Sequence, residues 1–366
     1  MTFIPLEHYT NIYFHFLLFI TFITFFSGNS IELSDSGNLQ AKKITGNLLL
    51  VIITLYMGLR PISPYFGDMV LYNKEITEYQ LGKPLTIKKD PLFEVYKYFC
   101  ATSLTPFFFF FSCSVVYILG LYYGTKKIFK EYWFYCFLAL VSSFSFWAYG
   151  VNGIRNGVAS SLFILAISSR NRIFKWLLLV ACIYIHISML LPVAAYLTMT
   201  VFKKLNIQYV FVYWLLCIPV ALIAGSFFEN LFMSLGIVED KQITGYFNDF
   251  SKTGEGIDLK VGFRWDFLLY SASGVFAGWY FIFKKKINDV FYRQLVGTYL
   301  LANAFWILVI QANYSNRFAY LSWFMLAIVI FYPLLKYQLY KQQHKVIGNI
   351  MFVYFAFTYL FNVILG

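Results

Sequence analysis

The chain has 366 residues, of which 60% are hydrophobic, 22% are aromatic and only 13% are charged. One soluble core cannot bury so much apolar surface, so the composition excludes a soluble globular protein and indicates a polytopic membrane protein. The formal net charge of +12 is explained by basic loops on one side of a membrane, so we expect no nucleic-acid partner.

Apolar segments of about 17 to 25 residues, long enough to cross a bilayer as helices, recur along the whole chain. They predict an all-α polytopic integral membrane protein with about ten full spans in a single membrane domain, residues 1–366. The first segment lacks a basic stretch before it and a small-residue cleavage site, so we expect a retained helix. The predicted spans are 9–26, 44–60, 104–121, 132–149, 154–169, 209–227, 264–283, 291–311, 316–335 and 346–365.

A further apolar tract, 176–202, has basic residues before it at 170–175 and after it at 203–204. Because basic flanks favour the cytoplasmic side, both ends of this tract are expected on that side. We therefore predict a re-entrant pair of short helices that breaks between His186 and Pro192. This pair brings the expected total to 11–12 helices.

Alternate loops carry most of the lysines and few acids, as at 126–130 and 284–286. The positive-inside rule places these loops in the cytoplasm. Two loops on the opposite side, about 61–103 and 228–263, are longer than a simple connection requires. The charge pattern thus predicts two extended outer loops.

The first outer loop contains an amphipathic segment, because Met69, Tyr72, Ile76 and Tyr79 follow a 3-4-3 spacing. This spacing predicts a short helix with one apolar face, lying on the membrane surface or folded back into the bundle. Asp68 stands at its start. It is either an ordinary helix cap or a catalytic or substrate-hydroxyl residue, and the two roles are compatible.

Asp90 and Pro91 repeat this arrangement before a predicted helix over 92–100. An aspartate directly before a proline at the first helical position is typical of a helix start. We therefore interpret Asp90 as a structural cap.

Four arginines, Arg60, Arg155, Arg264 and Arg317, stand where an apolar run meets a polar stretch on the predicted outer side. Three of them, all except Arg60, fall in the first turns of helices, where the positive end of the dipole disfavours a cation. Helix N-terminal amides and guanidinium groups both bind phosphate, so these arginines are candidates for an anion site. The alternatives are arginines that snorkel to the interface or that pair with a carboxylate, such as Asp266 beside Arg264.

His186 is the histidine that lies within an apolar tract away from the chain ends, at the apex of the predicted helix pair. A neutral imidazole can accept or donate a proton near pH 7. A buried histidine can equally be a hydrogen-bonding residue of the core. Both interpretations stay open on the sequence alone.

Several signatures are absent from the sequence, including a Walker loop, HExxH, GxSxG and an acidic metal pair. We therefore predict no metal site and no cofactor. The five cysteines lie in or beside apolar segments without CxxC spacing, which predicts buried thiols.

An ordered series of motifs resembles the EpsG-like branch of the Wzy polysaccharide polymerases, over roughly residues 44–336. The motifs are Gly58-Leu59-Arg60 followed by Gly67-Asp68 and Tyr72, Asp90-Pro91-Leu92-Phe93, Asn152-Gly153-Ile154-Arg155-Asn156-Gly157-Val158-Ala159, Ile185-His186-Ile187-Ser188, and Arg317-Phe318. Asn156 stands where the family commonly has glutamine. Two prolines replace a glycine-rich run between Arg60 and Gly67. Both departures bear on sugar specificity.

The resemblance implies a GT-C-like membrane glycosyltransferase in the bacterial cytoplasmic (inner) membrane. Such a metal-independent polymerase transfers an undecaprenyl-pyrophosphate-linked glycan chain onto a lipid-linked oligosaccharide repeat unit at the outer face. The product is O-antigen of lipopolysaccharide, capsule or exopolysaccharide. The implied partners are the undecaprenyl-pyrophosphate-linked oligosaccharide, membrane lipid and, as a candidate, a chain-length regulator protein.

For such chemistry we expect Arg155, Arg264 and Arg317 on the pyrophosphate and His186 as the base. Asp68, as a second catalytic candidate, and Arg60 would shape the site, and Tyr72 would contact the substrate. A lipid-linked oligosaccharide flippase or transporter is the alternative from another class, with cations along a central cavity. An O-antigen-ligase-like transferase would share the donor and differ in the acceptor.

Overall fold

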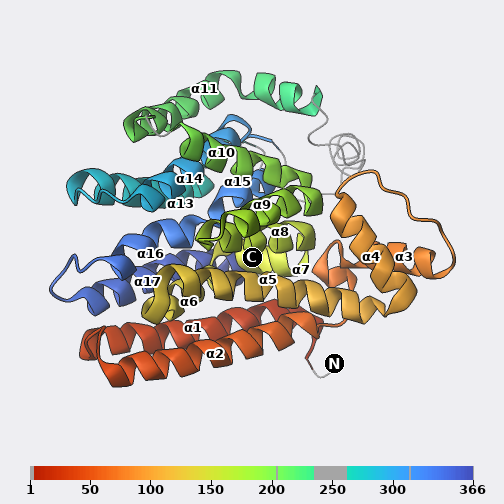
Figure 1. Cartoon of the computed structure of the whole chain (residues 1–366), viewed down its shortest axis with the longest axis horizontal. Helices are drawn as coiled ribbons and strands as arrows, with labels where there is room; N and C mark the ends of the chain where they lie inside the picture. Colours follow the sequence, from red (N-terminus) through yellow and green to blue (C-terminus); the bar gives the residue numbers. More distant parts are fainter. Residues whose placement is uncertain (1–3, 203–204, 235–261, 313–314, 366) are drawn as a thin grey trace. The chain divides into compact units, whose positions relative to one another are not determined.

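Helices form most of the part of the chain that the structure describes, residues 4–202, 205–234, 262–312 and 315–365. Figure 1 shows this computed structural model, in which no strand occurs within those ranges. The predicted all-α class is therefore confirmed for these residues.

Seven of the described helical segments are long and apolar enough to cross a membrane. They are Leu6–Ser30, Ser36–Gly58, Pro106–Val141, Ile207–Gly225, Trp265–Lys284, Asn316–Lys336 and Gln343–Ile364. Two shorter apolar segments, Ile154–Ser168 and Ile187–Val201, accompany them. The chain is thus a multi-pass membrane protein, whereas the predicted total of ten full spans stays a prediction.

The chain forms two compact units, residues 1–193 with 330–366, and residues 194–329. In the first unit lie α1 (Leu6–Ser30), α2 (Ser36–Gly58), α3 (Met69–Gln80), α4 (Pro91–Ser103), α5 (Pro106–Phe129), α6 (Trp133–Val141), α7 (Phe144–Val151), α8 (Ile154–Ser168), α9 (Arg172–Ile185) and α17 (Gln343–Tyr359). In the second lie α11 (Ile207–Ser234), α13 (Trp265–Trp279), α14 (Val290–Leu308) and α15 (Asn316–Trp323). Both α10 (Leu190–Val201) and α16 (Leu326–Lys336) pass from one unit to the other.

Several helices begin where side-chain caps satisfy the first free amides. Asp35 accepts a hydrogen bond from the backbone amide of Asn38 before α2, and Asn171 accepts one from that of Phe174 before α9. Thr105 caps α5 in the same way and is followed by Pro106. These caps explain why the helices start at these residues.

The predicted span 132–149 is wrong as a single helix, because it divides into α6 and α7 at Ser142 and Ser143. Serine hydroxyls compete with the helical backbone for hydrogen bonds, which weakens a helix at such a pair. Both serines are buried, so the break is enclosed by protein, where a membrane protein tolerates it.

The second predicted outer loop also begins later than expected. α11 continues to Ser234, with a non-helical residue at Ala224, so residues 228–234 are helical. The rest of that predicted loop up to 261 lies outside the described residues. Residues 61–103, the first predicted outer loop, hold α3 and α4.

The amphipathic helix predicted after Asp68 is confirmed as α3. Its buried residues are the four of the 3-4-3 pattern, Met69, Tyr72, Ile76 and Tyr79. α4 confirms the helix predicted after Asp90. The two helices pack together through their aromatic faces, with Tyr79 edge-on to Tyr98 at 5.2 Å between ring centroids.

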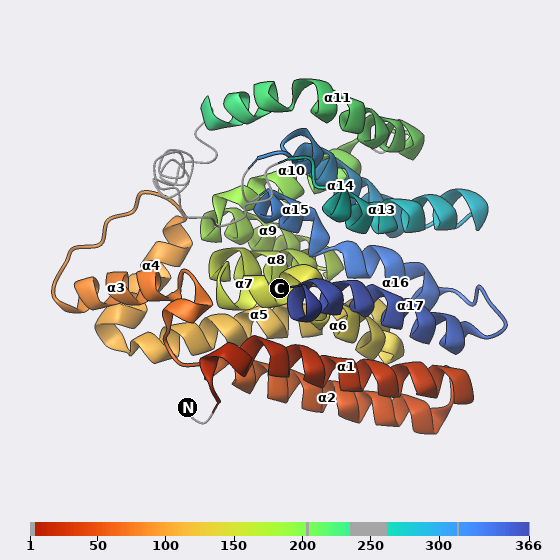
Figure 2. The same ribbon diagram turned by 180° about the vertical axis from the view of Figure 1, so that it is seen from behind.

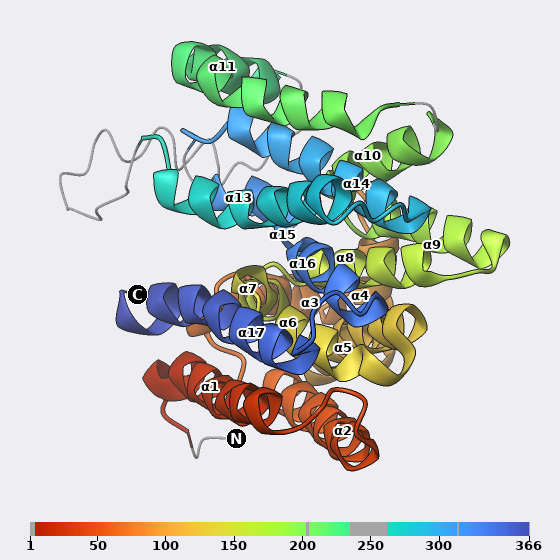
Figure 3. The ribbon, with the colours of Figure 1, turned by 90° about the vertical axis from the view of Figure 1, so that its left-hand side faces the viewer.

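Small residues let the helices of the first unit approach closely. A Cβ at Gly120 of α5 would lie 2.7 Å from the Ser161 hydroxyl of α8, and one at Gly28 of α1 would lie 2.8 Å from the His344 carbonyl of α17. Figure 3 shows α17 alongside α1. Such close backbone packing is typical of helices in membranes, and it fixes α8 against α5.

Basic turns gather at one end of the first unit. At this end Lys127 of α5 lies over the Phe174 ring near the start of α9, and His344 of α17 hydrogen-bonds the Ile31 carbonyl after α1. In both Figure 1 and Figure 2, α3 and α4 lie at the opposite end. The common end of these turns agrees with the topology expected from the charges.

Candidate functional site

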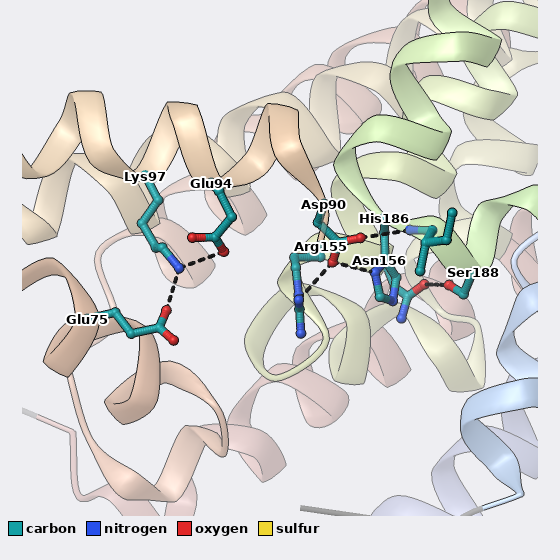
Figure 4. Close-up of polar contacts among 9 residues, drawn as sticks. Glu75, Asp90, Glu94, Lys97, Arg155, Asn156, His186 and Ser188 are labelled. Atoms are coloured by element: carbon teal, nitrogen blue, oxygen red, sulfur yellow. Dashed lines mark hydrogen bonds and ion pairs between the residues drawn. The ribbon is translucent and has the colours of Figure 1, made fainter. Parts of the chain in front are cut away.

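Asp90 is the centre of a polar cluster in the first unit. Its side chain is only 1% exposed and accepts hydrogen bonds from groups of two other segments (Figure 4). Arg155 Nη1 lies 2.7 Å and His186 Nδ1 2.9 Å from its Oδ2, while the Ile187 amide lies 2.8 Å from its Oδ1. One carboxylate thus joins an arginine of α8 to the residues that follow α9.

The interpretation of Asp90 as a structural cap is confirmed for its position, directly before Pro91 and α4, and is wrong for its side chain. Its side chain makes no cap hydrogen bond to α4, and its backbone is left-handed, with φ 52° and ψ 55°. Aspartate is among the few residues other than glycine that adopt this conformation readily. The turn directs the carboxylate away from its own helix and toward Arg155 and His186.

His186 occupies the helix break predicted between 186 and 192. α9 ends at Ile185, His186 is extended with φ −154° and ψ 118°, and a 3₁₀ turn over Ile187–Met189 leads into α10. Pro192 falls in the first turn of α10, where the missing amide costs nothing. The break frees the Ile187 amide to bind Asp90 and turns the imidazole toward the same carboxylate.

This geometry orients the two nitrogens of the His186 ring. When Nδ1 donates its proton to Asp90, Nε2 of the neutral imidazole is a proton acceptor. A carboxylate at Nδ1 also stabilises the imidazolium that forms when Nε2 takes a proton. The side chain is 17% exposed, so the ring is not fully enclosed by protein.

Asp90 is ionised at neutral pH. Burial raises its pKa, but the hydrogen bond from His186, the electrostatic interactions with His186 and Arg155, and the Ile187 amide lower it, so its pKa ends below the ordinary value. The buried carboxylate is stable because three donors compensate for the water that it has lost.

Arg155 lies in the first turn of α8, as predicted, and its side chain is 26% exposed. Its guanidinium carbon stands 5.8 Å from the centre of the Tyr72 ring, and burial raises the pKa of Tyr72 while Arg155 lowers it. Tyr72 is 6% exposed. It therefore lies beside Arg155, where it can hold the guanidinium plane in place.

The same tyrosine ring connects this cluster to a second one. Lys97 of α4 lies 5.8 Å from the Tyr72 ring centre and is 1% exposed. It pairs with Glu94 at 2.8 Å and with Glu75 of α3. Figure 4 shows both clusters. Lys97 thus holds α3 to α4 and, through Tyr72, braces the side of Arg155.

Arg60 is 1% exposed and donates to backbone carbonyls. Nη1 lies 2.5 Å from the Met57 carbonyl and Nη2 3.4 Å from that of Val151. These carbonyls belong to the last turns of α2 and α7, where the helix dipole favours a cation. Among the residues that the structure describes, Arg60 forms no ion pair. Arg60 therefore connects the C-terminal ends of α2 and α7.

The Asp68 turn is joined to the segment that precedes Arg155. The Asp68 amide donates to Asn152 Oδ1 at 3.0 Å, and a Cβ at Gly67, whose φ is 62°, would lie 2.4 Å from that oxygen. The Asp68 side chain does not cap α3. The Asn152 side chain thus joins the Asp68 turn to the segment before Arg155.

Arg264 and Arg317 belong to the second unit. Arg264 precedes α13 and binds Asp266 through Nε at 2.9 Å and Nη2 at 2.7 Å, while its guanidinium lies 3.6 Å from the Phe267 ring centre. This is the carboxylate pairing named above as an alternative. Arg317 lies in the first turn of α15. The guanidinium groups of Arg317 and Arg264 both interact electrostatically with the Tyr320 side chain.

Two features of the site were missed from the sequence. The role of Asp90 gave no distinct signal, because a helix cap explains an Asp-Pro pair equally well. Lys97 did give one, since it shares a helical face with Phe93, Cys100 and Ala101 in an otherwise apolar stripe. A lone lysine on such a face indicates a buried ion pair.

All five cysteines are free and buried, as predicted. They are Cys100, Cys113, Cys136, Cys182 and Cys217.

Comparison with known proteins agrees with the ordered motifs. A family model described as the EpsG family matches residues 43–366, which extends the resemblance seen over 44–336 to the end of the sequence. No curated protein and no solved structure matches the chain. The family indicates a polysaccharide polymerase-like role of the glycosyltransferase kind. With nearly the whole length matched, the chain belongs to the EpsG family.

Proposed function

We propose that the protein is a Wzy-type polymerase of the bacterial cytoplasmic membrane. It transfers an undecaprenyl-pyrophosphate-linked glycan onto a lipid-linked repeat unit at the outer face. The observation that carries this proposal is the buried carboxylate of Asp90, which holds Nδ1 of His186 and the guanidinium of Arg155 at one place. A glycosyl transfer from a pyrophosphate needs a proton acceptor and a cation close together.

In the proposed reaction, the acceptor hydroxyl attacks the anomeric carbon of the donor chain. Its oxygen forms the new glycosidic bond, its proton passes to His186 Nε2, and the bond between the anomeric carbon and the pyrophosphate oxygen breaks. Undecaprenyl pyrophosphate leaves with the bonding electrons. Asp90 stabilises the imidazolium, so proton transfer occurs without a change in the protonation of Asp90.

Arg155 is the residue of the first unit placed to stabilise the leaving group. It is partly exposed, lies in the first turn of a 15-residue helix and is held in orientation by Asp90 and Tyr72. Amides of that turn add to the field that favours an anion. Arg264 and Arg317 of the second unit remain candidates for binding the pyrophosphate, as expected from the sequence. No step of this chemistry calls for a metal ion.

The experiment is incubation of the purified protein with the lipid-linked repeat unit of its source cells. A ladder of chain lengths is expected, and His186→Ala and Arg155→Ala should abolish it. The matched controls are His15→Ala and Arg172→Ala, which remove an exposed histidine and an exposed arginine outside the cluster. These controls should leave the ladder intact.

The alternatives predict other outcomes of the same assay. A flippase in vesicles would move the lipid-linked unit across the membrane and leave it unextended. A ligase-like transferase would extend a non-lipid acceptor. Unextended substrate with wild-type protein, or a normal ladder with His186→Ala, would overturn the proposal.

A further inference from the structure

A second side-chain pair connects the segments that carry the Asp90 cluster. The Ser188 hydroxyl donates to Asn156 Oδ1 at 3.0 Å across 32 residues of sequence. Asn156 directly follows Arg155 in the first turn of α8, and Ser188 lies two residues after His186. Figure 4 shows the pair beside the His186 ring. The two segments are therefore tied twice, once through Asp90 and once through this pair.

The bond from Ser188 fixes the orientation of the Asn156 amide. Because Oδ1 accepts from Ser188, Nδ2 lies on the other side of Cγ, and its two N–H donors point away from the Ser188 hydroxyl. Within the described part of the chain, Nδ2 donates to no residue. Asn156 is partly exposed, so these donors face a region that solvent or a ligand can enter.

The chemistry of this group differs from that of its neighbour. Arg155 carries a full charge and suits a phosphate oxygen. A neutral amide with its oxygen already bonded offers donors alone, which suits an uncharged acceptor oxygen, such as a sugar hydroxyl or an acetamido carbonyl. The two groups belong to consecutive residues, and a pyrophosphate is bonded directly to the sugar that it carries.

We propose that Asn156, held by Ser188, determines sugar specificity by donating to an oxygen of the sugar next to the pyrophosphate. This inference rests on the proposed function and adds the part of the substrate that the site distinguishes. A donor built to meet a substrate oxygen discriminates against a sugar that lacks it, because the donor then stays without its partner.

The test compares two probes, undecaprenyl pyrophosphate without sugar and the lipid-linked repeat unit of the source cells. Their affinities are measured by thermophoresis in nanodiscs. Asn156→Leu, which has a similar shape and no donor, should weaken binding of the sugar-bearing probe by about 5- to 10-fold. It should leave binding of undecaprenyl pyrophosphate unchanged within about 2-fold. Equal losses for both probes, or none for either, would overturn the inference.

Ser188→Ala provides a second variant that keeps the amide. It releases the orientation of Asn156, so a loss of about 2- to 5-fold is expected with the sugar-bearing probe alone. If Asn156→Leu does not fold, the inference is tested with Ser188→Ala alone. Unchanged affinity of Ser188→Ala for the sugar-bearing probe would then overturn the inference.

Arg155→Ala separates this inference from the proposed function. It should weaken the binding of both probes. Unchanged affinity for both after Arg155→Ala contradicts the proposed function itself. A loss after Arg155→Ala without one after Asn156→Leu contradicts only the role of Asn156.

Discussion

Arg155 and Arg264 look alike in the sequence, but the structure gives them different surroundings. Arg155 pairs with Asp90, a carboxylate 65 residues away that is 1% exposed and also binds His186. Arg264 pairs with Asp266, two residues away and 28% exposed. The first pair exists only when two distant segments of the first unit come together, and a third segment brings His186 to the same carboxylate. The second is complete within one turn of chain.

The difference indicates where a substitution will matter. Removing one member of a buried charge network leaves the others without compensation, whereas an exposed local pair contributes little. A buried network shared by several elements also fixes geometry, which catalysis needs. We therefore expect Asp90 to be essential and Asp266 to be dispensable, and the predictions below test this contrast.

Asp90→Asn should have the largest effect. Asparagine has nearly the same shape and can still accept from the Ile187 amide, but it cannot stabilise an imidazolium. The initial rate of ladder formation should fall by about 10³- to 10⁴-fold, as for loss of the carboxylate in other Asp–His pairs. Asp266→Asn, the matched control, should change the rate by less than about 2-fold. Comparable losses in both variants would refute the contrast.

Lys97→Met should have a smaller effect, mainly on stability. The change removes the cation that Glu75 of α3 and Glu94 of α4 share. Because Glu75 is 48% exposed, water compensates in part, and we expect a loss of about 1–3 kcal/mol. Thermal unfolding in detergent measures it. Lys83→Met, which removes an exposed lysine paired with Glu78, should not shift the unfolding temperature. A shift of equal size in Lys83→Met would argue against a bracing role.

The pH dependence of stability should show the smallest effect. The pKa of Asp90 is lower in the folded protein than its ordinary value of about 3.9. Its contribution to stability is therefore fully present above that ordinary value and is lost as the pH falls through the folded-state pKa. The difference in unfolding temperature between wild type and Asp90→Asn should shrink as the pH falls below about 4. A difference that grows in this acidic range would contradict the assignment.

The sequence predicted those features that depend on local chemistry. The 3-4-3 spacing predicted the buried face of α3, the Asp90-Pro91 pair predicted the start of α4, and the change of pattern at His186 predicted the break between α9 and α10. Apolar periodicity missed the division at Ser142 and Ser143. A helix break enclosed by protein carries no hydropathy signal.

The candidate site was predicted only in part. Arg155, His186 and Tyr72 were named from the sequence, and they lie close together. Asp90 was assigned to a cap, since a short-range interpretation of Asp-Pro was sufficient. The pairing of Arg264 with Asp266 stood as an alternative because the two residues are close in sequence.

By itself, the sequence determined a helical multi-pass membrane protein, its family and the residues that can carry charge at helix starts. These follow from composition, periodicity and local order, which no distant contact changes. Only the tertiary structure decided which carboxylate serves Arg155 and His186, since 65 and 96 residues separate Asp90 from them. A left-handed turn before Pro91 points the Asp90 side chain away from α4, and the packing of α8 and α9 brings its partners to it.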